Sequence, residues 1–303
     1  MASVSTENQS ILLIINPIAG RKKAQRILHK IIYSLSRSNY KTKIFYTSGK
    51  GEAINIVKEN AAYVQRIICC GGDGTLNEIF TGLNMINLQI PVGYIPTGTT
   101  NDLAHSLNLP TTTKKAISTA IRGQIREHDL GSFNGEQYFS YIASFGAFTK
   151  VAYSTPQWLK NLFGHTAYVF NGILSIADIR SHSVKVVADG KEISGDFVFG
   201  SVSNSMVIAG LVKLPKSGIS FTDGEFEVTL IKKPKNRKDL KAIVHGILHR
   251  KYDDRYMYFF KAKEISFTFN EGVAWTTDGE FAGTLETVHI KNLRQKAQIV
   301  MSR

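Results

Sequence analysis

The sequence predicts a two-domain protein: an α/β domain with a mainly parallel sheet and helices on both faces, followed by a mostly antiparallel β-sandwich. Short apolar runs alternate with helically spaced segments over residues 11–122, which is typical of βαβ units. After residue 131, Asn-Gly and Asp-Gly pairs separate β-rich runs and indicate hairpins. A chain of 303 residues is long enough for two cores. We place the domains at residues 1–131 and 132–303, with the last strand able to return to the first domain.

The elements of the first domain follow from the spacing of their apolar residues. Short apolar runs predict strands over residues 11–15, 41–47, 66–70 and 91–95. The first helix has one apolar face, formed by Ala24, Ile27, Leu28, Ile31, Ile32 and Leu35. Similar spacing predicts helices around residues 53–57, 76–83 and 111–122, the last with a threonine as its N-cap.

The second domain is predicted to be rich in strands. Strands are expected over residues 197–202, 226–231, 265–269, 288–290 and 298–301. Asn134-Gly135 and Asp189-Gly190 are expected to form hairpin turns. Helical segments are expected around residues 158–179 and 239–249.

Charge and cysteine content narrow the class of protein. The chain has 37 Lys and Arg against 24 Asp and Glu, a formal net charge of +13, which favours an anionic partner. No aromatic-rich RNA-binding segment or basic zipper occurs, so we expect no nucleic acid. Cys69 and Cys70 are adjacent and lack both a disulfide framework and metal-ligand spacing. We find no spanning segment or signal peptide and expect a cytoplasmic protein that visits the inner membrane face.

The first loop that could bind a ligand lies between a predicted strand and a predicted helix and has the sequence Asn16-Pro17-Ile18-Ala19-Gly20-Arg21. Ligands of open α/β sheets bind at the carboxyl ends of strands. The start of the helix would present free N–H groups and its positive dipole end to a phosphate. The same residues also fit an ordinary strand-to-helix turn, and the segment alone leaves both interpretations open.

The second loop is Gly71-Gly72-Asp73-Gly74-Thr75-Leu76-Asn77-Glu78. Its glycines let the backbone approach a ligand closely. Asp73 could hold or position Mg²⁺, and Thr75 and Asn77 could bind phosphate or ribose. The segment is neither a Walker A loop nor a dinucleotide-binding fingerprint, because it lacks the lysine of the first and the third glycine of the second.

The third loop is Pro96-Thr97-Gly98-Thr99-Thr100-Asn101-Asp102. It adds hydroxyl groups, an amide and a second carboxylate at the end of a predicted strand. Asp102 is expected to be the N-cap of the next helix, which is compatible with a role in the site.

In order and spacing, these three loops resemble the bacterial diacylglycerol kinase family of lipid kinases, the wider group that includes sphingosine and ceramide kinases. The resemblance continues in the second domain through Asn204-Ser205-Met206, Thr222-Asp223-Gly224 and Asp278-Gly279-Glu280. It runs nearly from end to end of the chain. It implies transfer of the γ-phosphoryl group of ATP to a lipid hydroxyl, with Mg²⁺ as cofactor.

The resemblance also implies roles for individual residues. The residues expected to bind the nucleotide are Asn16, Gly20, Arg21, Thr47, Gly71, Gly72, Asp73, Gly74, Thr75, Asn77, Thr99, Asn101 and Asp102. The general base corresponds to Asp278, with Glu280 nearby, and Asp73 completes the catalytic set. A structural Mg²⁺ would be held by Asp223 with the backbone near Ser220 and Glu225. Here Thr222 precedes Asp223, whereas the family often has a second acid.

Other interpretations stay open at this stage. Asp278-Gly279 also fits a plain hairpin turn. NAD kinase and phosphofructokinase-like sugar kinases share a Gly-Gly-Asp-Gly loop and the α/β domain, and a non-catalytic basic nucleotide-binding or nucleic-acid-binding protein is a third alternative. The resemblance favours diacylglycerol, giving phosphatidic acid, but a polyprenol, a monoacylglycerol or a sphingoid base also offers one hydroxyl. The expected partners are this lipid alcohol and an anionic membrane surface, and a homodimer is left open.

Overall fold

The computed structural model describes residues 10–146, 180–204, 207–208, 212–213, 220–249 and 251–302. The chain divides into two compact units. The first unit comprises Met1–Asp129 and Gln295–Arg303, and the second comprises Leu130–Arg294. The helix expected around residues 158–179 lies outside the described residues.

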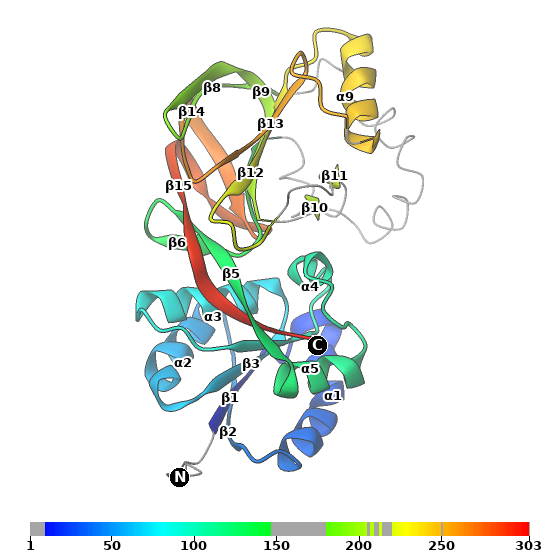
Figure 1. The fold of residues 1–303 in the computed structure, drawn as a ribbon, viewed down its shortest axis with the longest axis vertical. Coiled ribbons are helices and arrows are strands. Elements are labelled where there is room, and N and C mark those ends of the chain that lie inside the picture. Colours follow the sequence, from blue (N-terminus) through cyan, green and yellow to red (C-terminus); the bar gives the residue numbers. More distant parts are fainter. Residues whose placement is uncertain are drawn as a thin grey trace, which may run out of the picture. The chain divides into compact units, whose positions relative to one another are not determined.

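The sheet of the first unit is parallel, as predicted. Its strands are β1 (Ser10–Ile15), β2 (Lys41–Tyr46), β3 (Arg66–Gly71) and β4 (Val92–Pro96). They are arranged in the order β4-β3-β1-β2, and the end of β15 (Glu280–Met301) adds a further parallel strand beside β4, where Ile299 pairs with Val92 (Figure 1).

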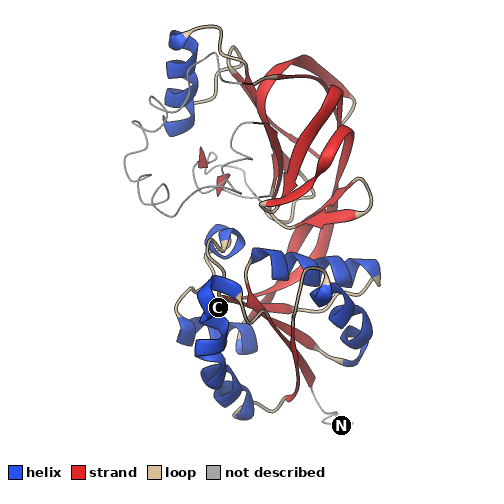
Figure 2. Cartoon of the chain, turned by 180° about the vertical axis from the view of Figure 1, so that it is seen from behind, coloured by secondary structure: helices blue, strands red, loops and turns tan. Residues whose placement is uncertain are grey.

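Helices cover both faces of this sheet (Figure 2). They are α1 (Ala19–Ser36), α2 (Glu52–Asn60), the 3₁₀ turn Ala61–Tyr63, α3 (Asp73–Met85), α4 (Asp102–Ser106) and α5 (Thr113–Arg122). Ile11, Leu13 and Ile15 pack in one cluster with residues of α1 and α5. Leu12 and Ile14 are fully buried as well, on the opposite face. A strand that is apolar on both faces is typical of a covered parallel sheet.

The second unit is largely antiparallel, which confirms that part of the prediction. Its strands are the last part of β5 (Gln124–Phe133), β6 (Gln137–Phe139), β7 (Ile142–Gly146), β8 (His182–Ala188), β9 (Lys191–Ser203), β12 (Phe226–Lys232), β13 (Met257–Ala262), β14 (Glu264–Thr277) and the first part of β15. β10 (Val207–Ile208) and β11 (Val212–Lys213) form a separate short pair. The helix α9 (Arg237–His249) confirms the one expected over residues 239–249.

The connections between these strands differ from the predicted sandwich of two sheets. β9 and β14 each pair with β8 along their first half and with β7 along their second half, so the hydrogen bonding is continuous. β14 can change partner because its register with β15 shifts between Thr268 and Val273. The strands predicted at residues 288–290 and 298–301 are parts of one long strand, β15.

The three Asx-Gly pairs form tight turns between antiparallel strands. Asn134, Asp189 and Asp278 all have positive φ, and so does the glycine that follows each of them. Two consecutive residues with positive φ are the signature of the type I′ hairpin turn, which Asn-Gly and Asp-Gly favour. The hairpin predictions for Asn134-Gly135 and Asp189-Gly190 are confirmed.

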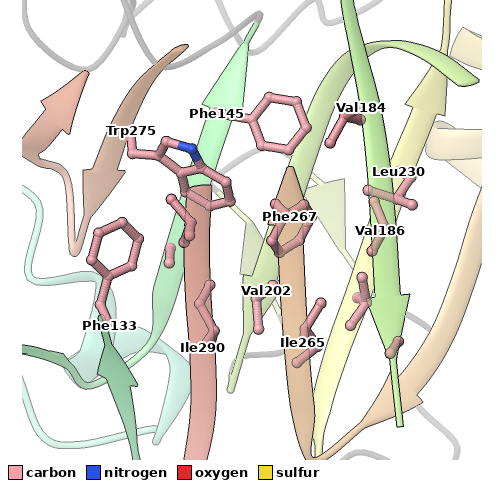
Figure 3. Close-up of a cluster of buried hydrophobic side chains, with 14 of the residues drawn as sticks. Phe133, Phe145, Val184, Val186, Val202, Leu230, Ile265, Phe267, Trp275 and Ile290 are labelled. Atoms are coloured by element: carbon pink, nitrogen blue, oxygen red, sulfur yellow. The ribbon is translucent and has the colours of Figure 1, made fainter. Parts of the chain in front are cut away.

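The core of the second unit is built around aromatic side chains (Figure 3). The ring of Trp275 lies 4.9 Å from that of Phe145 and 5.0 Å from that of Phe267. The rings of Phe267 and Trp275 meet edge to face at 67°, a geometry that aromatic pairs favour, and the rings of Phe145 and Trp275 are tilted by 50°. The core fixes the positions of β7, β9, β12 and β14, so the opposite faces of these strands are also held in place.

Within the described residues, no helix combines the length and the apolar character needed to cross a membrane.

Candidate active site

The predicted loops of the first unit meet at the carboxyl edge of its sheet. Asn16 N donates to Cys70 O at 2.9 Å, and Thr97 N donates to Gly71 O at 2.8 Å. Thr47, which was expected to contact the nucleotide, follows β2 and donates its N–H to Ile15 O at 2.9 Å. The ends of four neighbouring strands are therefore linked by backbone hydrogen bonds, as the position of ligand sites in open α/β sheets requires.

Glycines allow these loops to touch. Gly20 has a φ of +52°, and a Cβ there would lie 1.8 Å from Thr97 O. A Cβ on Gly98 would lie 2.6 Å from Gly72 Cα, and one on Gly71 would lie 2.7 Å from Thr75 Cβ. Any side chain at these positions would push the loops apart, so the glycine pattern has a steric reason that does not depend on a ligand.

The loop before α1 is organised by Asn16. Its side-chain amide donates to Thr75 Oγ1 at 3.1 Å, and its side-chain oxygen accepts from Ile18 N at 3.2 Å. This links the first loop to the second. α1 itself has no side-chain cap and no acidic residue in its first turn, so its N-terminal dipole stays available to an anion. Arg21 lies in the first turn of this helix.

Asp73 links the second loop to the third. Its carboxylate accepts hydrogen bonds from Asp102 N at 2.9 Å and Leu103 N at 3.3 Å, with Thr100 Oγ1 at 3.4 Å. Burial, reinforced by the nearby Asp102 carboxylate, raises the pKa of Asp73 to about 6. Both carboxylate oxygens thus hold the start of α4, where they satisfy free N–H groups.

The N-cap expected at Asp102 was wrong by one position. Asn101 occupies the N-cap position of α4, and Asp102 is the first helical residue. Asn101 has a φ of +53°, accepts a hydrogen bond from Tyr94 Oη at 3.1 Å and donates to Gly98 O at 3.0 Å. The first N–H groups of α4 donate to Asp73, which lies in another loop, and no local sequence pattern could reveal this contact.

The remaining predicted nucleotide residues are more accessible. Thr99 is exposed, whereas Gly72, Gly74 and Asn77 are half-buried at the start of α3. The side-chain oxygen of Asn77 is buried and has no hydrogen-bond partner in the described part of the chain. These residues surround the N-terminus of α3, where a phosphate would meet backbone N–H groups.

Glu78 has a role that its sequence position did not reveal. Its carboxylate accepts hydrogen bonds from Gly51 N at 2.7 Å and Ala53 N at 3.2 Å. These N–H groups lie at the start of α2, whose N-cap residue, Gly51, has no side chain to satisfy them. Glu78 therefore positions the loop after Thr47. The signal in the sequence was the lack of a capping side chain before α2, which indicates that a residue from elsewhere must satisfy these N–H groups.

In the second unit, Asp278 is buried in a cage of donors. Its Oδ2 accepts from Ser140 N at 2.7 Å and Ser140 Oγ at 2.8 Å. Its Oδ1 accepts from Tyr141 N at 3.0 Å and Ile142 N at 3.1 Å. Burial raises the pKa of Asp278 to about 6 in spite of these four hydrogen bonds. The residue both holds the start of β7 and keeps a carboxyl group that titrates close to neutral pH.

Glu280 lies on the far side of the same turn. It is the first residue of β15, it pairs with Thr277, and its side chain is exposed. The turn therefore separates one buried and one exposed carboxyl group, and Asp278 is the one that the fold positions.

Among the residues predicted to hold a structural Mg²⁺, Asp223 has a cationic side chain as its partner. Asp223 Oδ1 accepts from Glu225 N at 3.1 Å, and its Oδ2 lies 2.6 Å from the ammonium of Lys261. Ser220 Oγ lies 3.4 Å from Thr222 Oγ1. In the described part of the chain, no group of three or more His, Cys, Asp or Glu residues could hold a metal. An ammonium therefore lies beside Asp223, and the structural Mg²⁺ site stays a prediction.

Glu227 extends this cluster and was not foreseen. It is fully buried on β12, and its Oε1 lies 3.7 Å from Lys261 Nζ. Burial raises the pKa of Glu227 to about 7, and Lys261 opposes that shift. An acid within the apolar run of residues 226–231 was the signal in the sequence.

The fold and the loops define a class: the first unit is a parallel α/β unit with glycine-rich loops at the carboxyl ends of its strands. Comparison with known proteins makes this specific. Residues 10–133 match the family described as the diacylglycerol kinase catalytic domain. Over 293 residues the chain is 31% identical to the diacylglycerol kinase of Bacillus subtilis strain 168, covering 96% of each chain. It is 28% identical to the diacylglycerol kinase of Staphylococcus carnosus, covering 95% of this chain and 93% of that one.

The chain therefore belongs to the diacylglycerol kinase family, and it is a lipid kinase. Its fold matches the crystal structure of a diacylglycerol kinase from Bacillus anthracis with a TM-score of 0.76 and 23% identity, covering 98% of each chain. This agreement concerns the fold alone.

Proposed function

We propose that this chain transfers the γ-phosphoryl group of ATP to the free hydroxyl of diacylglycerol, giving phosphatidic acid. The observation that carries the proposal is the linked set of loops after β1, β3 and β4, together with the end-to-end similarity to proteins named diacylglycerol kinase. Phosphoryl transfer asks a protein mostly for positioning and charge neutralisation, which such loops provide.

The nucleotide would lie on the first unit. The N-termini of α1 and α3 offer N–H groups to its phosphates, and Asn16, Thr75 and Asn77 offer polar side chains beside them. Arg21 supplies a positive charge from the first turn of α1. Thr47 and Thr99 lie at the two flanks of this region.

A divalent cation would enter with the nucleotide as part of the substrate, since Mg²⁺ normally neutralises the phosphates of ATP. Asp73 does not fit a resident metal as it stands, because both of its oxygens are bound to the start of α4. Its negative charge near the phosphate loops would attract the cation through water.

Asp278 would take the proton from the lipid hydroxyl. A pKa of about 6 leaves most of this carboxyl group ionised at pH 7, and it remains basic enough to accept a proton. Three of its four hydrogen bonds come from backbone N–H groups that cannot turn away. The fourth comes from the Ser140 hydroxyl, which can rotate and leave Oδ2 to the substrate.

The substrate lies in a membrane, so the enzyme must meet a lipid surface. The net charge of +13 favours an anionic one. Part of this charge is on the exposed residues Lys233, Lys235, Arg237 and Lys238, just before and at the start of α9. A solvated loop would carry the same charges, and only a binding measurement separates the two interpretations.

The proposal is tested by incubating the protein with labelled ATP and a panel of lipid alcohols. The panel contains diacylglycerol, monoacylglycerol, a polyprenol and a sphingoid base in mixed micelles. We expect labelled phosphatidic acid as the main product. A clear preference for another alcohol would overturn the assignment of diacylglycerol while leaving the lipid kinase class intact.

A further inference from the structure

A row of hydroxyl groups crosses the second unit on the face opposite its aromatic core. In the register of β14, β7, β9 and β12, Thr276 is opposite Ser144, Ser144 is opposite Ser201, and Ser201 is opposite Thr229. All four side chains are buried. Side chains alternate along a strand, so these residues share the face that the core residues Phe145, Val202 and Val228 do not use. We call these four residues the hydroxyl row.

Half of the hydroxyl row is satisfied internally and half is not. Ser144 Oγ and Thr276 Oγ1 are 3.0 Å apart and form a hydrogen bond. Ser201 Oγ and Thr229 Oγ1 are buried, and neither has a hydrogen-bond partner among the residues that the structure describes. A buried hydroxyl without a partner is costly, so two directly opposite each other need an explanation.

The next pair of residues on this face, two positions further along the strands, is also polar. There Ser203 is opposite Glu227, and Ser203 Oγ donates to Glu227 O at 3.4 Å. Within the described residues, both carboxyl oxygens of Glu227 are buried without a hydrogen bond, although Oε1 forms an ion pair with Lys261 at 3.7 Å. The hydroxyls of Ser201 and Thr229 and the carboxyl group of Glu227, which is paired with Lys261, therefore form one contiguous polar patch.

The face becomes apolar in the opposite direction. Two residues along the strands, about 7 Å away, Phe199 is opposite Ile231, and both are buried. Gly146 is opposite Phe199, and an added Cβ there would lie 2.3 Å from Val198 O, so the two strands approach closely at this point. The face thus changes from unpartnered polar groups to hydrocarbon over one step, which matches an amphipathic ligand with a polar head and apolar chains.

The hydroxyl row also begins next to the proposed general base. Asp278 follows Thr276 by two residues, and its N–H donates to Ile142 O at 2.8 Å. Ile142 is opposite Ser203 in the sheet. A lipid whose oxygens lay along the row would have its free hydroxyl at the Asp278 end. All of these residues belong to the second unit.

We propose that the hydroxyl row binds the oxygens of the lipid alcohol, with Ser201 and Thr229 as hydrogen-bond donors to the glycerol and ester oxygens. Glu227 accepts from the lipid at the edge of the same patch, and Phe199 and Ile231 contact the beginning of the acyl chains. This inference rests on the proposed function for the identity of the lipid, but its residues are assigned by the geometry of the sheet.

The test uses two near-isosteric variants, Ser201→Ala and Thr229→Val, and a matched control. The control is Thr268→Val, which removes an exposed hydroxyl from β14 away from the row. With dioleoylglycerol in mixed micelles, the KM for the lipid should rise about 2- to 10-fold for each row variant, the effect of one hydrogen bond. The KM for ATP should stay unchanged, and the control should match the wild type.

Thermal unfolding separates binding from a structural role. Because the two hydroxyls have no protein partner, their removal should leave Tm equal or slightly higher. An unchanged lipid KM with a raised Tm would mean that the row is a buried polar patch without a ligand, and a clear fall in Tm would mean that the hydroxyls are structural. Either result overturns the proposal.

A binding measurement keeps this inference separate from the proposed function. Retention of a fluorescent diacylglycerol analogue is compared between the wild type and the Ser201→Ala variant without ATP. If the lipid panel shows another preferred alcohol, the proposed substrate is wrong, and the same variants are assayed with that alcohol. If the Ser201→Ala and Thr229→Val variants bind and turn over the preferred lipid alcohol as the wild type does, the proposal that the hydroxyl row binds the lipid is refuted.

Discussion

Replacing Asp278 by asparagine tests the most constrained carboxyl group of the second unit. The carboxylate accepts four hydrogen bonds, two on each oxygen, from Ser140, Tyr141 and Ile142. Asparagine keeps one acceptor oxygen and places an NH₂ group, which is itself a donor, at the other position. Two donors therefore lose their acceptor whichever way the amide turns.

The smaller of the two losses sets the expected destabilisation. If the amide NH₂ faces Ser140, the hydroxyl can rotate away and one backbone N–H is left buried without a partner. Such a group costs about 1–3 kcal/mol. In domains of 150–250 residues, each kcal/mol shifts Tm by about 2–4 °C, so we expect Tm to fall by roughly 2–12 °C.

Turnover should fall much further than stability explains. If Asp278 is the general base, its removal lowers kcat by roughly 10²–10⁴-fold at temperatures well below Tm. The affinity for ATP should hardly change, because the residues expected to bind the nucleotide lie on the first unit. In the wild type, kcat should decrease as the pH falls through about 6, because a protonated carboxyl group cannot accept the proton.

The matched control is Ser140→Ala. It removes the one donor that can rotate, and Asp278 Oδ2 still accepts from Ser140 N, so the free energy of unfolding should change by no more than about 1 kcal/mol and turnover should persist. If Asp278→Asn leaves Tm unchanged, the cage of donors does not hold the start of β7. If it keeps near wild-type kcat, Asp278 is a hairpin residue only, and Glu280 becomes the candidate base.

Four further perturbations test other parts of the structure. Gly20→Ala places a Cβ against Thr97 O and forces positive φ on alanine, so Tm should fall and the KM for ATP should rise by at least several-fold; unchanged ATP kinetics would contradict the loop packing. Glu78→Gln keeps one of two acceptors for the start of α2, so the KM for ATP should rise with little change in kcat in initial-rate assays; an equal loss in both would indicate a direct catalytic role. Lys261→Met should lower Tm, and millimolar Mg²⁺ should restore part of the lost stability. The wild type should not be stabilised by Mg²⁺ in the absence of nucleotide. If Mg²⁺ does stabilise the wild type and Asp223→Ala abolishes that effect, the metal site predicted from the sequence is supported instead. Co-sedimentation with anionic vesicles should weaken sharply as salt increases, and equal binding to neutral vesicles at all salt concentrations would exclude electrostatic attachment.

The sequence by itself determined the elements of the first unit and the position of its loops. β1, β3 and β4 are short apolar runs, and α1 has a single apolar face, so local periodicity is sufficient to predict them. The turns at Asn134, Asp189 and Asp278 were equally clear, because positive φ selects Asx-Gly pairs. The loops after the strands meet at one edge because parallel strands place all their carboxyl ends there.

The tertiary structure alone decided which groups these residues contact. Asp73 reaches the start of α4 and Glu78 the start of α2, across 29 and 27 residues of sequence. Lys261 neutralises Asp223 from a neighbouring strand, and the hydroxyl row exists only through the register of four strands that are distant in the sequence. Periodicity and turn patterns are local, whereas strand register and the pairing of buried charges depend on packing between distant segments. The sequence therefore predicted the elements and loops that carry the candidate site residues, and the fold determined how their side chains are held.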